Sequence, residues 1–362
     1  MAIRILHTAD LHLDRPFLGL GARRTARRAE MRQRFEEILA LAVEKEVAGL
    51  IIAGDLFDRP AADSGLWVKA KLKELTARGI EVFLVPGNHD PLGECGFYHG
   101  EFPAGVHVFK EESFVACETL PGVVVYGRAF SRARQTEDPL TGLTFLPGEG
   151  RRHIAVIHGQ LRTAPAVAED YAPFTSAAIA ASNLDYLALG HYHSFLDCSA
   201  GRTRAFYPGS PHRLDFGDRA ERRALLVTLS AEGVEVEPIS LPDRPFLELE
   251  GDLARPEKLY EELGRLDPRA YIRVRLTGHA VVPTTGLVAD LEEKFADRYF
   301  GFEVVLAEEE PAYGTEDRGP VAEAFLRRMA ARLAAAGDPE EAATVRLAMD
   351  YGLMALEGRD LP

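Results

Sequence analysis

Five short apolar runs in this chain each end in a cluster of Asp, Asn or His side chains. The segments that follow them are "TADLH", "GDLFD", "PGNHD", "HG" and "GHYH". Amphipathic stretches over Ala26 to Glu46 and Gly65 to Arg78 have helical periodicity and separate the first three runs. Strands that alternate with helices predict a layered α/β domain, with helices covering both sheet faces. The expected strands are Ile3 to His7, Ala48 to Ala53, Ile80 to Val85, Ile154 to Ile157 and Tyr186 to Leu189.

The polar residues behind these strands should converge, because the carboxyl ends of parallel strands line one edge of an open sheet. Imidazole, carboxylate and amide donors suit Mn²⁺, Fe²⁺ or Zn²⁺, whereas Mg²⁺ prefers oxygen ligands. Seven ligand candidates are too many for one ion with open positions, but enough for two ions that share a bridging carboxylate. Two ions about 3.5–4 Å apart are the usual device for in-line attack on a phosphoester. The candidates are Asp10, His12, Asp55, Asn88, His158, His191 and His193.

Composition narrows the class of protein. The net charge of −14 argues against a protein that coats nucleic acid by bulk electrostatics. No uncharged apolar stretch approaches the ~20 residues that span a bilayer, and the three separated cysteines favour neither a disulfide framework nor a thiolate zinc site. We therefore expect a cytoplasmic protein with no membrane partner. Local arginine clusters are candidate substrate contacts, and the alternative is a solvated helix face; these arginines are Arg23, Arg24, Arg27, Arg28 and Arg213.

The pattern of apolar and polar residues changes near Pro242, which suggests that the chain has three parts. We expect residues 1–242 to form the layered domain. The pattern over residues 243–310 predicts a compact βαβαβ unit that is too short to be an independent enzyme. Residues 311–362 are rich in Ala, Leu and Arg and predict a helical tail, with two helices broken at Gly337-Asp338-Pro339.

The motifs "DLH", "GDLFD", "GNHD", "IHG" and "GHYH" together resemble the series of the calcineurin-like metallophosphoesterase superfamily. The segments "LHTADLHLDRPFLGL" and "YPGSPHRLDFGD" are similar to the SbcD/YhaO-type DNA repair exonuclease branch. The motif series covers roughly residues 1–195, and the likeness of the last third is architectural only. The resemblance implies a core of β-sheets sandwiched by helices, then a small α/β capping domain and a helical segment that docks on an SMC-like ATPase. Members of the family often form homodimers through helices of the catalytic domain.

The resemblance also implies a role for each motif residue. One metal would be held by Asp10, His12 and His193, the other by Asn88, His158 and His191, and Asp55 would bridge them. His89 would contact the scissile phosphate and protonate the leaving oxygen. Asp58 stands where phosphatase relatives carry a carboxylate that orients this histidine, although some DNA repair relatives have His there.

The leading hypothesis is a Mn²⁺-dependent DNA exonuclease or endonuclease that acts in double-strand-break repair with an ATPase partner. The metal site alone fits other phosphoesters equally well, so a phosphomonoesterase or protein phosphatase is the first alternative. The second is a non-catalytic DNA-end-binding subunit that regulates an ATPase. Intact candidates for every ligand, together with His89, disfavour that second alternative.

Overall fold

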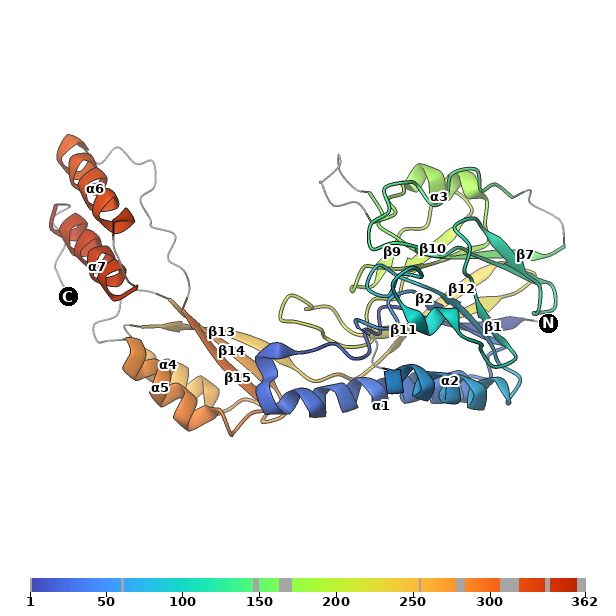
Figure 1. Cartoon of the computed structure of the whole chain (residues 1–362), viewed down its shortest axis with the longest axis horizontal. Helices are drawn as coiled ribbons and strands as arrows, with labels where there is room; N and C mark the ends of the chain where they lie inside the picture. Colours follow the sequence, from blue (N-terminus) through green and yellow to red (C-terminus); the bar gives the residue numbers. More distant parts are fainter. Residues whose placement is uncertain are drawn as a thin grey trace. The chain divides into compact units, whose positions relative to one another are not determined.

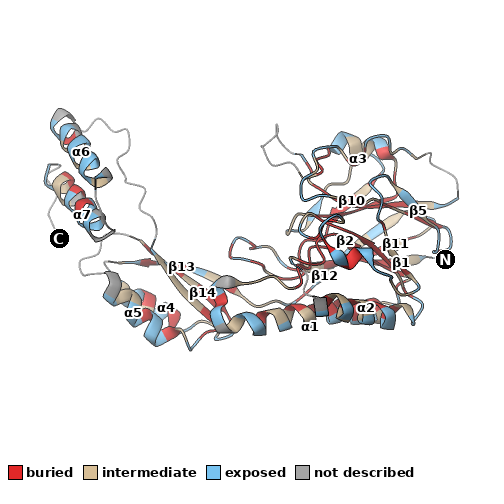
Figure 2. Cartoon of the chain, viewed as in Figure 1, coloured by how far each residue is buried: buried red, intermediate tan, exposed pale blue. Residues whose placement is uncertain are grey.

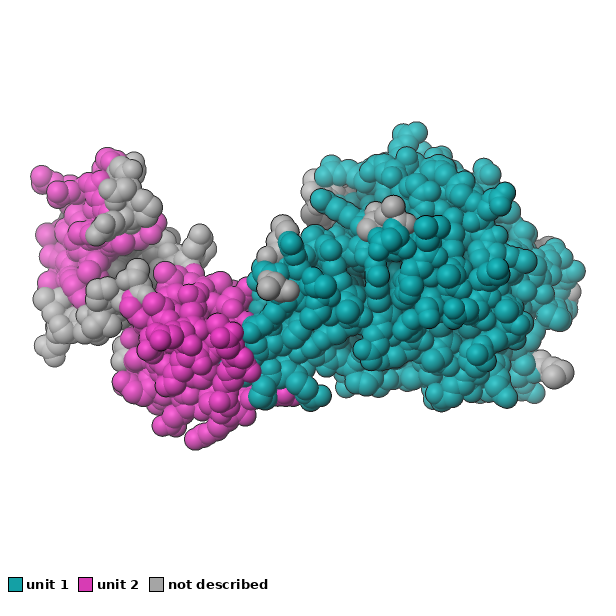
Figure 3. Space-filling model, turned by 60° about the horizontal axis from the view of Figure 1, so that its bottom comes forward, with its two compact units in different colours: residues 1–247, 268–271, 299–301 teal, residues 248–267, 272–298, 302–362 magenta. Residues whose placement is uncertain are grey.

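The chain divides into two compact units, which are described separately (Figure 3). The first unit comprises Met1–Leu247, Pro268–Tyr271 and Tyr299–Gly301, and the second comprises the remaining residues. The three-part division expected from the sequence stays a prediction. The structure, a computed structural model, describes residues 2–59, 62–145, 150–162, 171–253, 255–277, 284–306, 319–335 and 339–356.

The first unit contains two six-stranded sheets. In the first sheet β1 to β4 run parallel, β11 pairs antiparallel with β1, and β12 pairs antiparallel with β11. In spatial order its strands are β12 (Val234–Ser240), β11 (Arg223–Leu229), β1 (Ile3–Thr8), β2 (Gly49–Ala53), β3 (Glu81–Val85) and β4 (Val106–Val108).

The second sheet has a parallel centre flanked by antiparallel edges. Strands β6, β7, β8 and β10 run parallel, and β5 and β9 pair antiparallel with the outer two. In spatial order the strands are β5 (Val115–Cys117), β6 (Val123–Gly127), β7 (Arg152–His158), β8 (Tyr186–Gly190), β10 (Arg204–Tyr207) and β9 (Leu196–Asp197).

Three buried layers hold the two sheets and their helices together. Successive strand residues point to opposite faces, so Leu6 packs towards the helices while its neighbour Ile5 packs between the sheets. Helices α1 (Arg24–Glu44) and α2 (Ala62–Thr76) cover the outer face of the first sheet, and α3 (Ser176–Ser182) lies over the outer face of the second (Figures 1 and 2). Short 3-10 helices occupy Leu18–Arg23 and Gly96–His99.

This arrangement confirms the layered α/β fold and corrects one detail of it. The sequence pattern suggested helices on both faces of a sheet, whereas each sheet has helices on one face and the other sheet on its opposite face. Both inner faces are apolar, since residues such as Ile51 and Phe83 pack between the sheets against Val156 and Ala188. The polar strand ends therefore come from two sheets rather than one.

The carboxyl ends of the two sheets meet at one place. A Cβ atom added to Gly190, at the end of β8, would lie 1.8 Å from the carbonyl oxygen of Ala53, at the end of β2. A Cβ on Gly54 would lie 2.3 Å from the His158 ring. Only glycine permits such close approach, so these two positions let the loops behind β2, β7 and β8 come together.

The second unit is built around a three-stranded sheet ordered β13-β14-β15. Helices α4 and α5 contribute buried Leu259, Leu263, Leu291 and Phe295 to its core. The expected order of strand, helix, strand, helix and strand is present. These elements are β13 (Phe246–Asp252), α4 (Pro256–Leu263), β14 (Tyr271–Thr277), α5 (Thr284–Phe295) and β15 (Gly301–Leu306).

Two helices form the described part of the tail, α6 (Gly319–Ala334) and α7 (Pro339–Leu356). They pack closely, because a Cβ on Gly352 would collide with the Phe325 ring at 2.1 Å. The two expected helices are thus present, and most of the expected break between them lies outside the described residues. Among the helices of the described ranges, none is both long and apolar enough to cross a membrane.

Candidate metal centre

The loops behind β1 and β2 are joined through their backbones. The N–H of Asp10 donates to the carbonyl of Gly54 at 3.1 Å, and the N–H of His12 donates to that of Asp55 at 2.9 Å. Asp10, His12 and Asp55 have φ values of 53°, 45° and 49°. Such left-handed conformations cost about 1–3 kcal/mol each in a non-glycine residue and persist where the surrounding structure enforces them. The strained loops turn these side chains inward from the strand ends.

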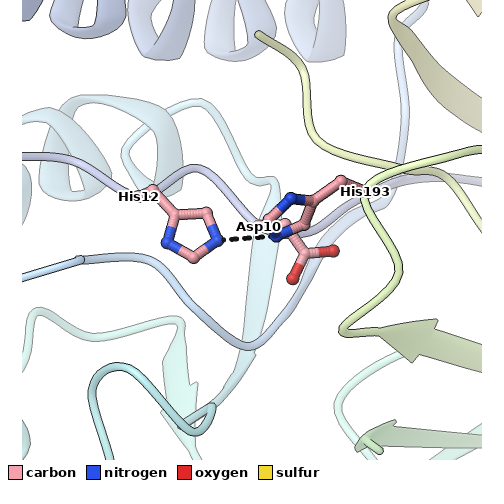
Figure 4. Close-up of side chains that lie close together, drawn as sticks. All are labelled: Asp10, His12 and His193. Carbon is pink, nitrogen blue, oxygen red and sulfur yellow. Dashed lines mark hydrogen bonds between the residues drawn. The ribbon is translucent and has the colours of Figure 1, made fainter. Parts of the chain in front are cut away.

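The first set of donors consists of Asp10, His12 and His193 (Figure 4). The two imidazole Nε2 atoms lie 3.1 Å apart, and one donor atom from each of the three residues lies within 4.8 Å of the others. Two nitrogens bound to one ion at about 2.1 Å lie about 3.0–3.4 Å apart, which is close to this distance. Burial lowers the pKa of His193 to about 3, so its ring is neutral and keeps a lone pair for a cation.

The second set consists of Asn88, His158 and His191. The Asn88 Oδ1 atom lies 2.9 Å from His158 Nε2 and 3.0 Å from His191 Nδ1. When His158 Nδ1 donates to the Ala53 carbonyl at 3.0 Å, its Nε2 presents a lone pair to the amide oxygen. Burial lowers the pKa of both histidines, that of His191 to about 3. Lone pairs of the His158 and His191 rings thus face the Asn88 oxygen, and a cation placed among these three atoms would stabilise the arrangement.

Asp55 lies between the two sets. Its Oδ2 atom is 3.6 Å from His12 Nε2 and 3.5 Å from His158 Nε2, one nitrogen from each set. Burial alone would raise the pKa of Asp55, but the surrounding histidines and a hydrogen bond from the His89 N–H at 2.9 Å together outweigh it, and the pKa is lowered. A single carboxylate oxygen thus faces donors of both sets, the position that a bridging ligand needs.

The buried carboxyl groups of the site also favour the binding of cations. Burial and then the charge of Asp55 raise the pKa of Asp10 well above its usual value. Both carboxyl groups are almost fully buried. Buried carboxylates are costly unless a positive charge compensates them, which a divalent ion does. The cluster of Asp and His residues could therefore hold divalent metals.

His89 stands beside the donors and faces solvent, with 41% of its side chain exposed. Its Nδ1 atom lies 3.3 Å from Asp58 Oδ1, and this hydrogen bond raises the pKa of His89. The same carboxylate oxygen lies 3.4 Å from His12 Nδ1. Donor atoms of His89, His12 and Asp55 also lie close enough together to bind one metal ion. Distance alone therefore does not decide whether His89 acts as a general acid or as a metal ligand.

Asp90 is a site residue that the sequence analysis did not assign. Its carboxylate accepts hydrogen bonds from Gly87 N–H at 2.8 Å, Phe57 N–H at 3.0 Å and the Tyr98 hydroxyl at 2.6 Å. Burial, followed by the charge of Asp55, raises its pKa to about 7. The available signal was its place at the end of "GNHD", immediately behind two predicted site residues.

Two further residues support His193 from the segment behind β10. Asp218 Oδ1 lies 3.9 Å from His193 Nδ1. The buried guanidinium of Arg222 donates to the carbonyls of His193 and His212, both at 3.2 Å. Nothing in the spacing of these residues marks them as neighbours of the site.

The candidate substrate arginines have varied surroundings. Arg27 is 1% exposed, and its guanidinium bonds Glu30 at 2.8 Å and the carbonyl of Arg213 at 2.7 Å. The side chain of Arg27 is thus enclosed by internal partners, and its part in substrate binding stays a prediction. Arg28 is half-buried, with Nε donating to the Arg15 carbonyl at 3.0 Å.

The other three arginines are accessible to different degrees. Arg24 is exposed, and Arg23 and Arg213 are half-buried. Arg213 NH1 donates to the Phe246 carbonyl at 3.4 Å. The part of these three arginines in substrate binding stays a prediction.

Comparisons with known proteins agree with the motif series. The chain is 30% identical to the uncharacterized metallophosphoesterase YhaO of Bacillus subtilis, over 60% of this chain and 56% of YhaO. It is 28% identical to the DNA double-strand break repair protein Mre11 of Methanosarcina mazei, over 72% of this chain and 42% of that protein. It is 26% identical to one of the subunits of the nuclease SbcCD of Escherichia coli K12, over 70% of this chain and 72% of that polypeptide.

The chain thus spans about half the length of the first two of these relatives. The calcineurin-like phosphoesterase family matches residues 3–195, slightly more than half of the chain. That stretch contains all seven ligand candidates as well as Asp58 and His89. The chain belongs to the calcineurin-like phosphoesterase family.

Proposed function

We propose that this protein is a metal-dependent DNA nuclease that hydrolyses phosphodiester bonds. The observation that carries the proposal is the pair of donor sets joined by Asp55, with half-exposed His89 beside them. The choice of DNA rests on relatives named as a DNA double-strand break repair protein and as part of a nuclease.

Manganese is the proposed metal, with iron and zinc as alternatives, because the donors mix imidazole, carboxylate and amide groups. Asp10, His12 and His193 would hold one ion, and Asn88, His158 and His191 the other, with Asp55 between them. When bound, two such ions supply an activated water and neutralise charge on the phosphate.

His89 is the proposed acid. Asp58 accepts from its Nδ1 and raises its pKa, which increases the fraction of protonated imidazole at neutral pH. The exposed edge of the ring can then give a proton to the departing sugar oxygen. Asp58 acts through His89 by fixing its orientation.

The tail is the proposed docking segment for an SMC-like ATPase that would work with the nuclease in DNA repair. Helices α6 and α7 leave large apolar side chains exposed, including Val321 and Leu356. Contiguous exposed apolar surface often marks a site that binds another protein, and these side chains support the proposal that the tail provides one.

The proposal is tested by incubating end-labelled linear duplex DNA with the protein and Mn²⁺. An aryl phosphomonoester and an aryl phosphodiester are assayed in parallel, and Asp55→Ala serves as the control. We expect DNA and the diester to be hydrolysed by the wild type but not by the variant. Turnover of the phosphomonoester without DNA cleavage would instead assign the protein to the phosphatases.

A further inference from the structure

Arg15 lies in the loop behind β1, immediately outside the metal centre. Its NH1 atom is 3.5 Å from Asp58 Oδ1, the same oxygen that lies 3.3 Å from His89 Nδ1. One carboxylate oxygen therefore separates the Arg15 guanidinium from the His89 ring. The side chain of Arg15 is 27% exposed.

Neighbouring residues hold the backbone around Arg15. Its N–H donates to the His12 carbonyl at 3.2 Å, and its own carbonyl accepts from Arg28 Nε at 3.0 Å. Asp14 pairs with Arg32 of α1 at 3.7 Å. Arg15 is thus presented from a fixed loop, which lowers the entropy lost when it binds a ligand.

Arg15 has fewer carboxylate partners than the nearby Arg27 and Arg32, which each have two. Asp58 is its one ion-pair partner among the described residues, and that carboxylate is shared with His12 and His89. Arg27 is buried by internal partners. Arg32 contacts Ser64 at 2.6 Å as well as Asp14. A guanidinium has five N–H donors, so the contact with Asp58 leaves donors for an anion.

We propose that Arg15 binds the DNA phosphate next to the one being cleaved. The inference rests on the proposed nuclease function and adds a substrate-positioning residue to it. The Arg15 side chain contacts Asp58, which in turn contacts His12, so we place the anion held by Arg15 beside the one held at the metals. A polynucleotide supplies that second anion, whereas a small phosphodiester does not. Arginine binds phosphate through paired N–H donors, which fixes position as well as charge.

The first test compares kcat and KM for Mn²⁺-loaded wild type, Arg15→Gln and Arg15→Lys on duplex DNA and on bis(4-nitrophenyl) phosphate. We expect Arg15→Gln to raise KM for DNA about tenfold, the size of one charge-assisted hydrogen bond, and to leave the small diester within about twofold. Arg15→Lys should recover part of the DNA affinity. Equal losses on both substrates would overturn the proposal, because Arg15 would then serve only to support Asp58 and His89.

The matched control is Arg151→Gln. Arg151 is also partly exposed and ion-paired, to Glu118 at 2.7 Å, but it lies just before β7, at the opposite end of that strand from His158. Both DNA and diester hydrolysis should stay at the wild-type level in this variant. A DNA-specific loss equal to that of Arg15→Gln would mean that any surface arginine contributes, and would overturn the assignment of Arg15.

The second test is independent of metal and catalysis. The affinity for a fluorescent duplex is measured in EDTA at several salt concentrations. Removing one phosphate contact should reduce the slope of log K against log salt by about 0.9 in Arg15→Gln, and Arg15→Lys should keep the wild-type slope. Unchanged slopes in Arg15→Gln would overturn the proposal. Should the wild type hydrolyse neither substrate, the nuclease function fails, while this binding measurement still decides the role of Arg15.

Discussion

Asp90 accepts a hydrogen bond from the backbone N–H of Phe57 at 3.0 Å, and this bond joins the loop of Asp55 and Asp58 to the loop of Asn88 and His89. Phe57 lies in the loop of Asp55, and Asp90 follows His89 directly. The other carboxylate oxygen of Asp90 accepts from Gly87, in its own loop. A buried carboxylate thus sets the spacing between the proposed bridging ligand and the proposed acid.

Replacing Asp90 with Asn should loosen this junction. The amide would place an NH₂ group against a donor, either Phe57 N–H or Gly87 N–H, and leave a buried donor unsatisfied. We expect the free energy of unfolding to fall by about 1–3 kcal/mol and bound Mn²⁺ to decrease. Thermal unfolding in EDTA and metal analysis after dialysis measure the two effects. As a control, Asp63→Asn changes a carboxylate that is 78% exposed and should shift stability by less than about 0.5 kcal/mol.

Replacing His89 with Gln tests whether this residue is an acid or a ligand. Hydrolysis of DNA should fall by about two to four orders of magnitude, the usual contribution of a general acid, while the metal content stays at the wild-type level. Metal analysis and single-turnover assays on the same preparation check both points. A variant that has lost metal along with activity would make His89 a ligand instead.

The strands and most of the site residues could be predicted because both depend on local pattern. β1 and β8 are apolar runs, and the predicted bounds differ from the observed ones by one residue at most. The elements that were not predicted have weak patterns. α3 has the sequence "SAAIAAS", without an apolar stripe, and β12 is an edge strand that contains Pro238, which a strand tolerates only at an edge or bulge.

The parts of the site that could not be predicted depend on contacts between distant segments. Asp218 lies 3.9 Å from His193, and Arg222 joins the carbonyls of that segment to the loop behind β8. Similarly, Arg27 looks like a solvated arginine in the sequence, and only the packing of α1 against the segment around Asp243 encloses it. The pattern of residue types carries no information about such partners.

His7 should make the stability of the protein depend on pH. It is fully buried in β1, with Nδ1 2.8 Å from the Tyr186 hydroxyl, and burial lowers its pKa to about 3. The unfolded chain binds this proton near pH 6.5 while the folded chain does not, so the contribution of neutral His7 is complete above pH 6.5. It is lost as the pH falls from 6.5 towards 3, at about 1.4 kcal/mol per pH unit.

The measurement is urea unfolding in EDTA at pH 7.5 and pH 5.5 for wild type and His7→Phe. The decrease in unfolding free energy between these pH values should be smaller in the variant by about 1.4 kcal/mol. His99→Phe, at an exposed position, provides the control and should behave like the wild type. Identical pH dependence in wild type and His7→Phe would show that His7 takes up its proton in the folded protein.

Deleting residues 320–362 should separate ATPase binding from hydrolysis. The deletion removes most of α6 and all of α7, which pack on each other through Phe325 and Gly352, and none of the seven ligand candidates. We expect the truncated protein to lose co-purification with a co-expressed SMC-like ATPase and to keep Mn²⁺-dependent hydrolysis of a small phosphodiester. A narrower change, Leu347→Glu, adds charge to an apolar side chain that is exposed in α7 and should weaken the same association. If the truncated chain still co-purifies, the docking surface lies elsewhere and the exposed apolar residues of the hairpin serve another purpose.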